Sequence, residues 1–174
     1  GGSTRDESGF PTTQMTLFTE KEDLMAILES MEQRPNINKK QIFLFGASQG
    51  GLISAMVAEE CKEKVAGMIL LFPALCIADD WRVRFKSESE IPKEFEFWGM
   101  KLGEEFFKSM RNFKTFDVIG HFERPVLILH GAEDEIVPIG YSVKAVKKYP
   151  KARLEEFAHE PHGFSEDGNR RMEA

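Results

Sequence analysis

The sequence has few cysteines, no long apolar run and no excess of basic charge. Its two cysteines, Cys61 and Cys76, do not form a Cys-x-x-Cys pair, so the sequence predicts neither a disulfide framework nor a thiolate metal site. No apolar stretch approaches the roughly 18 residues of a membrane-spanning helix, which argues against a membrane protein. The 23 basic and 29 acidic residues are mixed along the chain and give a net charge of −6, which argues against a nucleic-acid partner.

What is present is enough apolar material for one folded unit. The chain has 174 residues, 41% of them hydrophobic, so we expect residues 1–174 to form a single domain with a sizeable core. Residues 1–15 are polar and carry no apolar block of a signal peptide, and free thiols are typical of the cytosol. We therefore expect a cytoplasmic protein.

Strand-like and helix-like patterns alternate along the chain. Helical spacing of apolar residues predicts three helices, from Thr19 to the stop at Pro35, at about 50–63 and at 141–149. Thr19 and Glu22 have the spacing of a capping box, which predicts that the first helix begins at Thr19. Apolar runs predict four strands, at 41–45, 65–72, 126–130 and 152–157. This alternation is typical of an α/β fold with a mostly parallel sheet.

The interval between the second and third predicted strands is too long for a plain crossover. We expect residues 76–120 to form a helical cap inserted into the fold. The interval holds both tryptophans and seven of the fifteen phenylalanines. These aromatic side chains either form the core of a small subdomain or line a lid over an apolar acyl pocket, and both interpretations stay open.

The segment Gly46-Ala47-Ser48-Gln49-Gly50 lies between a predicted strand and a predicted helix. A tight strand-to-helix turn holds its serine in a strained conformation and crowds the neighbouring backbone, so we expect both glycines to be required. The pattern G-x-S-x-G alone is short enough to arise in an ordinary glycine-rich turn. The strand before it, the helix after it and the additional Gly51 favour a nucleophile at Ser48.

A serine nucleophile needs a base that is oriented by a carboxylate. Three acidic candidates follow the third predicted strand, namely Glu133, Asp134 and Glu135. Two histidines, His159 and His162, follow the fourth, and no third ligand is spaced to make them a metal site. Serine, acid and histidine thus each follow a different strand of one sheet edge, in the order found in α/β-hydrolases. The two remaining histidines, His121 and His130, are expected to be structural, with His130 capping its strand.

These motifs resemble those of the α/β-hydrolase superfamily, and specifically those of bacterial cinnamoyl and feruloyl esterases. The matching segments are Met15-Thr16-Leu17, Gly46 to Gly51, His130 to Pro138, and His162-Gly163-Phe164. The resemblance covers about residues 15–166. It implies that Ser48 is the nucleophile, Asp134 the orienting acid and His162 the general base.

The resemblance also implies a serine esterase that works through an acyl-enzyme on small or aromatic, hydroxycinnamoyl-type esters, with no cofactor and no metal. The backbone N–H of Gln49, at the start of the following helix, is predicted to be one oxyanion donor. The family takes its second donor from a loop after an early strand. This sequence has no counterpart of that loop, so the expected sheet is N-terminally incomplete.

Two other functions remain open from the sequence. One is a serine peptidase of the prolyl-oligopeptidase type, which uses the same triad, and the other is a scaffold fragment with weak catalysis. An incomplete parallel sheet also leaves an edge strand and apolar faces uncovered. We therefore expect a homo-oligomer formed through the uncovered edge. The resemblance itself implies a small-molecule ester as the substrate.

Overall fold

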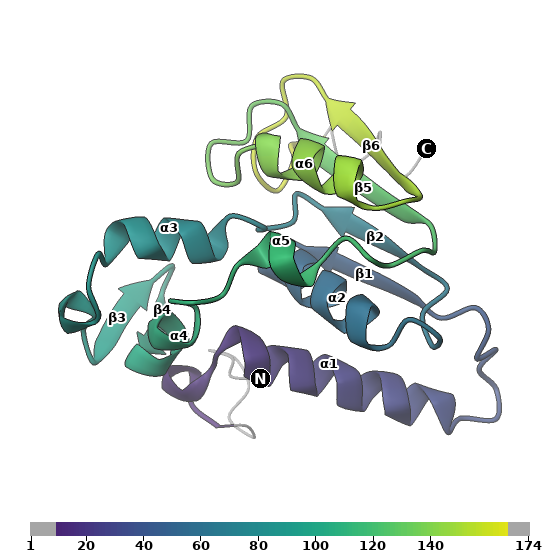
Figure 1. Ribbon diagram of the computed structural model, residues 1–174, viewed down its shortest axis with the longest axis horizontal. Helices are drawn as coiled ribbons and strands as arrows, with labels where there is room; N and C mark the ends of the chain where they lie inside the picture. The colour runs from purple at the N-terminus through teal and green to yellow at the C-terminus, as the bar shows by residue number, and fades with distance from the viewer. Residues whose placement is uncertain (1–9, 167–174) are drawn as a thin grey trace.

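The computed structural model describes residues 10–166 and contains a four-stranded parallel sheet in the order β1-β2-β5-β6 (Figure 1). Its strands are β1 (Phe43–Ala47), β2 (Gly67–Leu71), β5 (Val126–Gly131) and β6 (Ala152–Phe157). Three longer helices accompany them, α1 (Leu17–Glu32), α2 (Gln49–Glu60) and α6 (Gly140–Lys148). Every strand pair in this sheet is parallel, which confirms the predicted α/β fold. Within residues 10–166, no helix is both long enough and apolar enough to cross a membrane.

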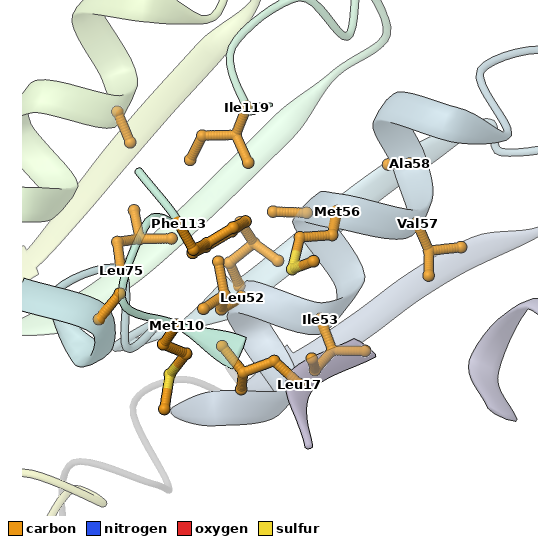
Figure 2. Packing of buried hydrophobic residues seen from close by; sticks show 14 of the residues in the cluster. Leu17, Leu52, Ile53, Met56, Val57, Ala58, Leu75, Met110, Phe113 and Ile119 are labelled. Atoms are coloured by element: carbon orange, nitrogen blue, oxygen red, sulfur yellow. The ribbon is translucent and has the colours of Figure 1, made fainter. Parts of the chain in front are cut away.

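One face of the sheet carries the main hydrophobic core. Leu44, Met68 and Val126 lie side by side in register on this face, and all three are buried. Helices α2 and α6 pack against this face, and α1 packs against α2. Figure 2 shows how the α2 side chains, including Leu52 and Met56, interlock with their neighbours in this core. The helical spacing of apolar residues in this helix predicts that Ile53, Met56, Val57 and Ala58 are buried, and all four are.

The opposite face of the sheet is only partly covered. Phe45, Ile69 and Leu127 lie in register across it, and Phe43 and Phe45 are 58% and 63% exposed. Among residues 10–166, no helix covers these two phenylalanines. At the other end of the same face, Phe164 from the loop after β6 packs near Leu71 and buries that end.

The first helix begins earlier than predicted. Thr16 is its N-cap, and the hydroxyl of Thr16 accepts the N–H of Thr19 at 3.1 Å while the hydroxyl of Thr19 accepts the N–H of Thr16 at 2.9 Å. The expected capping box of Thr19 with Glu22 is therefore wrong, because Thr19 is already in the first turn. The helical spacing of Leu24, Ile27, Leu28 and Met31 predicts one buried stripe, but Ile27 is exposed. A short 3-10 helix, η1 (Thr12–Gln14), precedes α1 and lies beside strand β4 (Met100–Gly103).

Residues 76–120, which we call the cap segment, lie beside one end of the main sheet (Figure 1). They contain helices α3 (Ile77–Arg84), η2 (Glu88–Glu90), α4 (Glu104–Ser109) and α5 (Thr115–Val118), and strands β3 (Glu94–Phe97) and β4 (Met100–Gly103). The two strands form an antiparallel hairpin, so a purely helical cap was a wrong expectation. Phe95 and Phe97 alternate with glutamates as in a strand, and Trp98 and Gly99 both take positive φ, as a two-residue hairpin turn requires.

Candidate active site

Ser48 occupies the turn between β1 and α2 in a strained backbone conformation. Its φ of 51° and ψ of −121° lie outside the regions that a non-glycine residue ordinarily adopts. Its N–H donates to the carbonyl of Leu71 at 2.9 Å, and its carbonyl accepts the N–H of Ala74 at 2.8 Å. The neighbouring strand β2 and the residues after it therefore hold the turn in place. Such strain, of about 1–3 kcal/mol, persists where the surroundings determine the conformation.

Two of the glycines around Ser48 are needed for close packing, but they are not the pair we expected. A Cβ atom on Gly46 would lie 2.2 Å from the carbonyl oxygen of Gly50. A Cβ atom on Gly51 would lie 2.8 Å from the side chain of Pro73. A Cβ atom on Gly50 would meet nothing within 4 Å, so the expectation that Gly50 is required is wrong for the described part of the chain.

The structure brings Ser48, Asp134 and His162 together at the carboxyl edge of the sheet, one after each of β1, β5 and β6. The Nε2 atom of His162 lies 3.2 Å from Ser48 Oγ, and its Nδ1 atom lies 2.8 Å from Asp134 Oδ2. Both distances are within hydrogen-bonding range, and only the Nδ1 side can carry the proton when Asp134 is ionised. The predicted residues are thus arranged as nucleophile, base and orienting acid would be, and their roles in catalysis stay predictions.

Asp134 is held by its own loop. Its Oδ1 atom accepts the backbone N–H groups of Ile136 and Val137 at 2.9 and 2.8 Å, and its side chain is fully buried. This local turn, in which an aspartate accepts N–H groups two and three residues ahead, leaves Oδ2 free to face His162. The rival acids Glu133 and Glu135 are exposed instead.

The other histidines do not approach Ser48. His159 pairs at the surface with Glu133, with 2.6 Å between Nδ1 and Oε1. His121 is exposed beside Glu59. In the part of the chain from 10 to 166, no three His, Cys, Asp or Glu side chains are grouped as a metal would require.

His130 differs from its expected role as a strand cap. Its side chain is completely buried at the end of β5, where Nδ1 lies 2.7 Å from Ser142 Oγ and Nε2 lies 2.9 Å from the carbonyl oxygen of Val137. Nε2 is also 3.2 Å from Asp134 Oδ2. Burial lowers the pKa of His130, which favours its neutral form. The sequence signal that could have indicated the contact between His130 and Asp134 is their spacing of four residues.

Gln49 follows Ser48 at the first position of α2. Its backbone N–H has no acceptor within residues 10–166 and lies at the positive end of the helix, as an oxyanion donor needs. Its side-chain Nε2 donates to Glu20 Oε2 at 2.5 Å. Burial raises the pKa of Glu20, and the bond from Gln49 opposes that effect. This tie joins α1 to the turn that carries Ser48.

An apolar cavity of about 380 Å³ opens beside Ser48 and Gln49. The cap segment supplies most of its wall through α3, the hairpin and α4, with side chains that include Trp81, Phe97, Trp98, Met100, Leu102 and Phe106. Two ionisable side chains of α3, Asp80 and Arg84, also line it. The aromatic residues of the cap segment therefore form part of the core and also line the cavity, as Trp81 does, and the binding of an acyl group there stays a prediction.

A parallel sheet that presents a strained serine, a buried aspartate and a histidine at the ends of three strands defines an α/β-hydrolase. The chain belongs to the prolyl oligopeptidase family, whose sequence profile matches residues 18–174.

Individual relatives agree with this assignment. The α/β-hydrolase domain-containing protein WAV2 of Arabidopsis thaliana is 28% identical over 166 residues, which cover 88% of this chain and 49% of WAV2. The structure of Est1E from Butyrivibrio proteoclasticus is 27% identical with a TM-score of 0.82, covering 91% of this chain and 67% of that one. A second structure, of Est1E with ferulic acid bound, is 25% identical with a TM-score of 0.83, covering 92% and 66%. The chain spans about half the length of the curated relatives it matches.

Proposed function

We propose that this chain carries the active site of a serine carboxylic ester hydrolase that works through an acyl-enzyme. The observation that carries the proposal is the continuous chain of contacts from Ser48 Oγ to His162 Nε2 at 3.2 Å and from His162 Nδ1 to Asp134 Oδ2 at 2.8 Å. A proton can pass along the first contact while the second fixes the imidazole tautomer.

The reaction has two halves. Ser48 Oγ attacks the ester carbonyl while His162 Nε2 takes the serine proton, and the negative charge on the carbonyl oxygen is stabilised by the N–H of Gln49. His162 returns the proton to the departing alcohol, which leaves an acyl group on Ser48. A water molecule then gives a proton to His162 and attacks the acyl-enzyme. The tetrahedral intermediate releases the carboxylic acid, and Ser48 regains its proton from His162.

The cavity supports small or aromatic acyl groups as the substrate class. Its wall is mostly apolar and aromatic, and it reaches Ser48 directly. A flat aromatic acid would gain from offset and edge-to-face contacts with rings such as Trp81 and Phe97. That Est1E has been seen with ferulic acid bound, at 25% identity over nearly this whole chain, supports the same class for this protein.

A serine peptidase is the second candidate, because the family model that matches residues 18–174 is that of prolyl oligopeptidases. The same three side chains serve either reaction, since both pass through an acyl-enzyme. Paired substrates separate the two: a p-nitrophenyl ester and the p-nitroanilide of the same acid should both be hydrolysed by a peptidase, whereas an esterase should hydrolyse only the ester at a useful rate.

The test of an activated serine is labelling by a fluorophosphonate probe, which reacts with the serine of an intact triad. We expect the folded wild-type chain to be labelled and Ser48→Ala to remain unlabelled. Ser54→Ala is the matched control, because Ser54 is a buried serine of α2 outside the triad. No labelling of a wild-type sample with a cooperative unfolding transition would favour the scaffold alternative.

A further inference from the structure

His130 lies directly behind the carboxylate of Asp134. His130 is near the C-terminal end of β5, and its side chain is completely buried. The side chain contacts three groups, namely the hydroxyl of Ser142 on α6, the carbonyl of Val137 and Asp134 Oδ2. The same Oδ2 atom faces His162. Two imidazoles therefore share one carboxylate oxygen, one on the side of Ser48 and one on the buried side.

The contacts of His130 define which of its nitrogens carries the proton. Nε2 faces two acceptors, the carbonyl oxygen of Val137 at 2.9 Å and Asp134 Oδ2 at 3.2 Å, so Nε2 must be the donor. Nδ1 faces the hydroxyl of Ser142 at 2.7 Å, and a hydroxyl can donate to it. Burial lowers the pKa of His130, so the ring is neutral and Nδ1 is an acceptor.

We propose that His130 is a positioning residue of the hydrolase site, whose Nε2–H is shared between the Val137 carbonyl and Asp134 Oδ2 and thereby holds the orientation of the carboxylate that faces His162. This inference rests on the proposed function. Ile136 and Val137 donate to the other oxygen of this carboxylate, so the Nε2–H of His130 is the third donor group that faces it besides His162. Ser142 acts one step further back, because its hydroxyl holds the Nδ1 side of the His130 ring.

The arrangement has a consequence for pH dependence. The titratable groups that face His130 are Asp134, at its Nε2, and His162 behind Asp134, whereas Ser142 and the Val137 carbonyl are neutral. A donor on Asp134 spreads part of the negative charge and weakens the pull of the carboxylate on a protonated His162. If the donor is lost, Asp134 faces His162 with more of its charge, and we expect the acid limb of the activity profile to move to higher pH.

The test compares His130→Gln with His130→Asn. The glutamine amide reaches the position of Nε2 and can donate to Asp134, whereas the shorter asparagine reaches only the position of Nδ1. The readout is the rate of fluorophosphonate labelling of Ser48 as a function of pH, which needs one turnover only. We expect His130→Asn to slow labelling about tenfold at neutral pH, as the loss of one hydrogen bond to a charged group does, and to move the acid limb to higher pH. His130→Gln should restore most of the rate and the wild-type acid limb.

Equal losses in both variants with an unmoved acid limb would mean that His130 only fills space, and unchanged labelling in His130→Asn would overturn the proposal outright. Absence of labelling in the wild type would instead remove the proposed function. A second measurement covers variants that do not fold: two-bond proton–nitrogen spectra of the wild-type protein report the tautomer of each histidine. The Nε2–H tautomer at neutral pH is expected for His130. An Nδ1–H tautomer would contradict the donation to Asp134.

Discussion

The edge of the sheet that carries Ser48 and the cap segment face the same cavity but are held in place in different ways. At the sheet edge Ser48, Asp134 and His162 are held by hydrogen bonds, such as those from Ile136 and Val137 to Asp134. In the cap segment, Trp81 contacts a set of surrounding rings at centroid distances of 4.8 to 6.5 Å. The edge therefore carries the proposed catalytic residues, and the cap segment supplies apolar packing and most of the cavity wall.

Residues with a strained backbone are also more numerous at the sheet edge than in the cap segment. Five non-glycine residues of the described chain have a positive φ, and four of them, Ser48, Phe72, His159 and Phe164, lie on the loops that follow β1, β2 and β6. The fifth, Trp98, is in the hairpin turn of the cap segment. Phe72 packs on the ring of His162 with 4.6 Å between centroids, and Phe164 packs on Phe72. Two of the strained positions, Ser48 and Phe72, thus contact His162, as is common where a site is preorganised.

The largest effect should come from the sheet edge. Asp134→Asn keeps an acceptor for the N–H groups of Ile136 and Val137 but presents an amide to His162, which favours the wrong imidazole tautomer. We expect kcat for ester hydrolysis to fall about 10⁴-fold, with the stability of the fold largely kept. Glu133→Gln is the control and should stay within about twofold, because exposed Glu133 pairs only with His159. Equal losses in the two variants would show that the buried carboxylate has no special role.

In the cap segment the main effect of a substitution should be a loss of stability. Trp81→Ala removes the ring at the centre of the aromatic cluster, and we expect a loss of about 3–5 kcal/mol in the free energy of unfolding. Urea denaturation followed by circular dichroism measures it. Val83→Ala, at an exposed position of the same helix, should change stability by less than about 0.5 kcal/mol. A near-neutral Trp81→Ala would mean that the cap segment is not part of the folded core.

The sheet edge could be predicted because its signals are local. Ser48 is marked by its glycines and by the strand and helix around it, and His162 by its place after a strand. The preference for Asp134 over its glutamate neighbours came from motif position alone. Its physical reason appears only in the structure, because the short side chain of an aspartate accepts N–H groups from the residues that follow it.

Features that depend on distant segments could not be predicted. Gly51 is required because Pro73 lies against it, and the sequence does not place the loop after β2 beside that helix. His130 meets Ser142 only because α6 folds back onto β5. The hairpin is the exception, because its signal is local: Phe95 and Phe97 are spaced by two residues, as in a strand, whereas the length of the interval predicts a helical cap.

A smaller effect tests whether the cap segment selects the substrate. Trp98 stacks on Phe97 at the cavity wall and is 64% exposed, with its ring 6.4 Å from that of His162. We expect Trp98→Ala to raise KM for an aromatic acyl ester about tenfold and to leave an acetyl ester within about twofold, because only the larger acid reaches the ring. Trp98→Phe should recover most of the difference. A fall in kcat for both esters would place Trp98 with the sheet edge instead.

The smallest effect on the site should come from the exposed phenylalanines, which belong to neither region. Phe43 and Phe45 belong to the edge strand β1 and form an apolar patch on the open face of the sheet, and such patches promote association. We propose that wild-type chains self-associate here. The double change of Phe43→Ser and Phe45→Ser should shift the mass measured by light scattering toward the monomer. Labelling of Ser48 should stay within about twofold, because neither side chain lines the cavity. A wild type that is monomeric at high concentration would contradict the association, and loss of labelling in the double variant would show that the open face supports the catalytic edge.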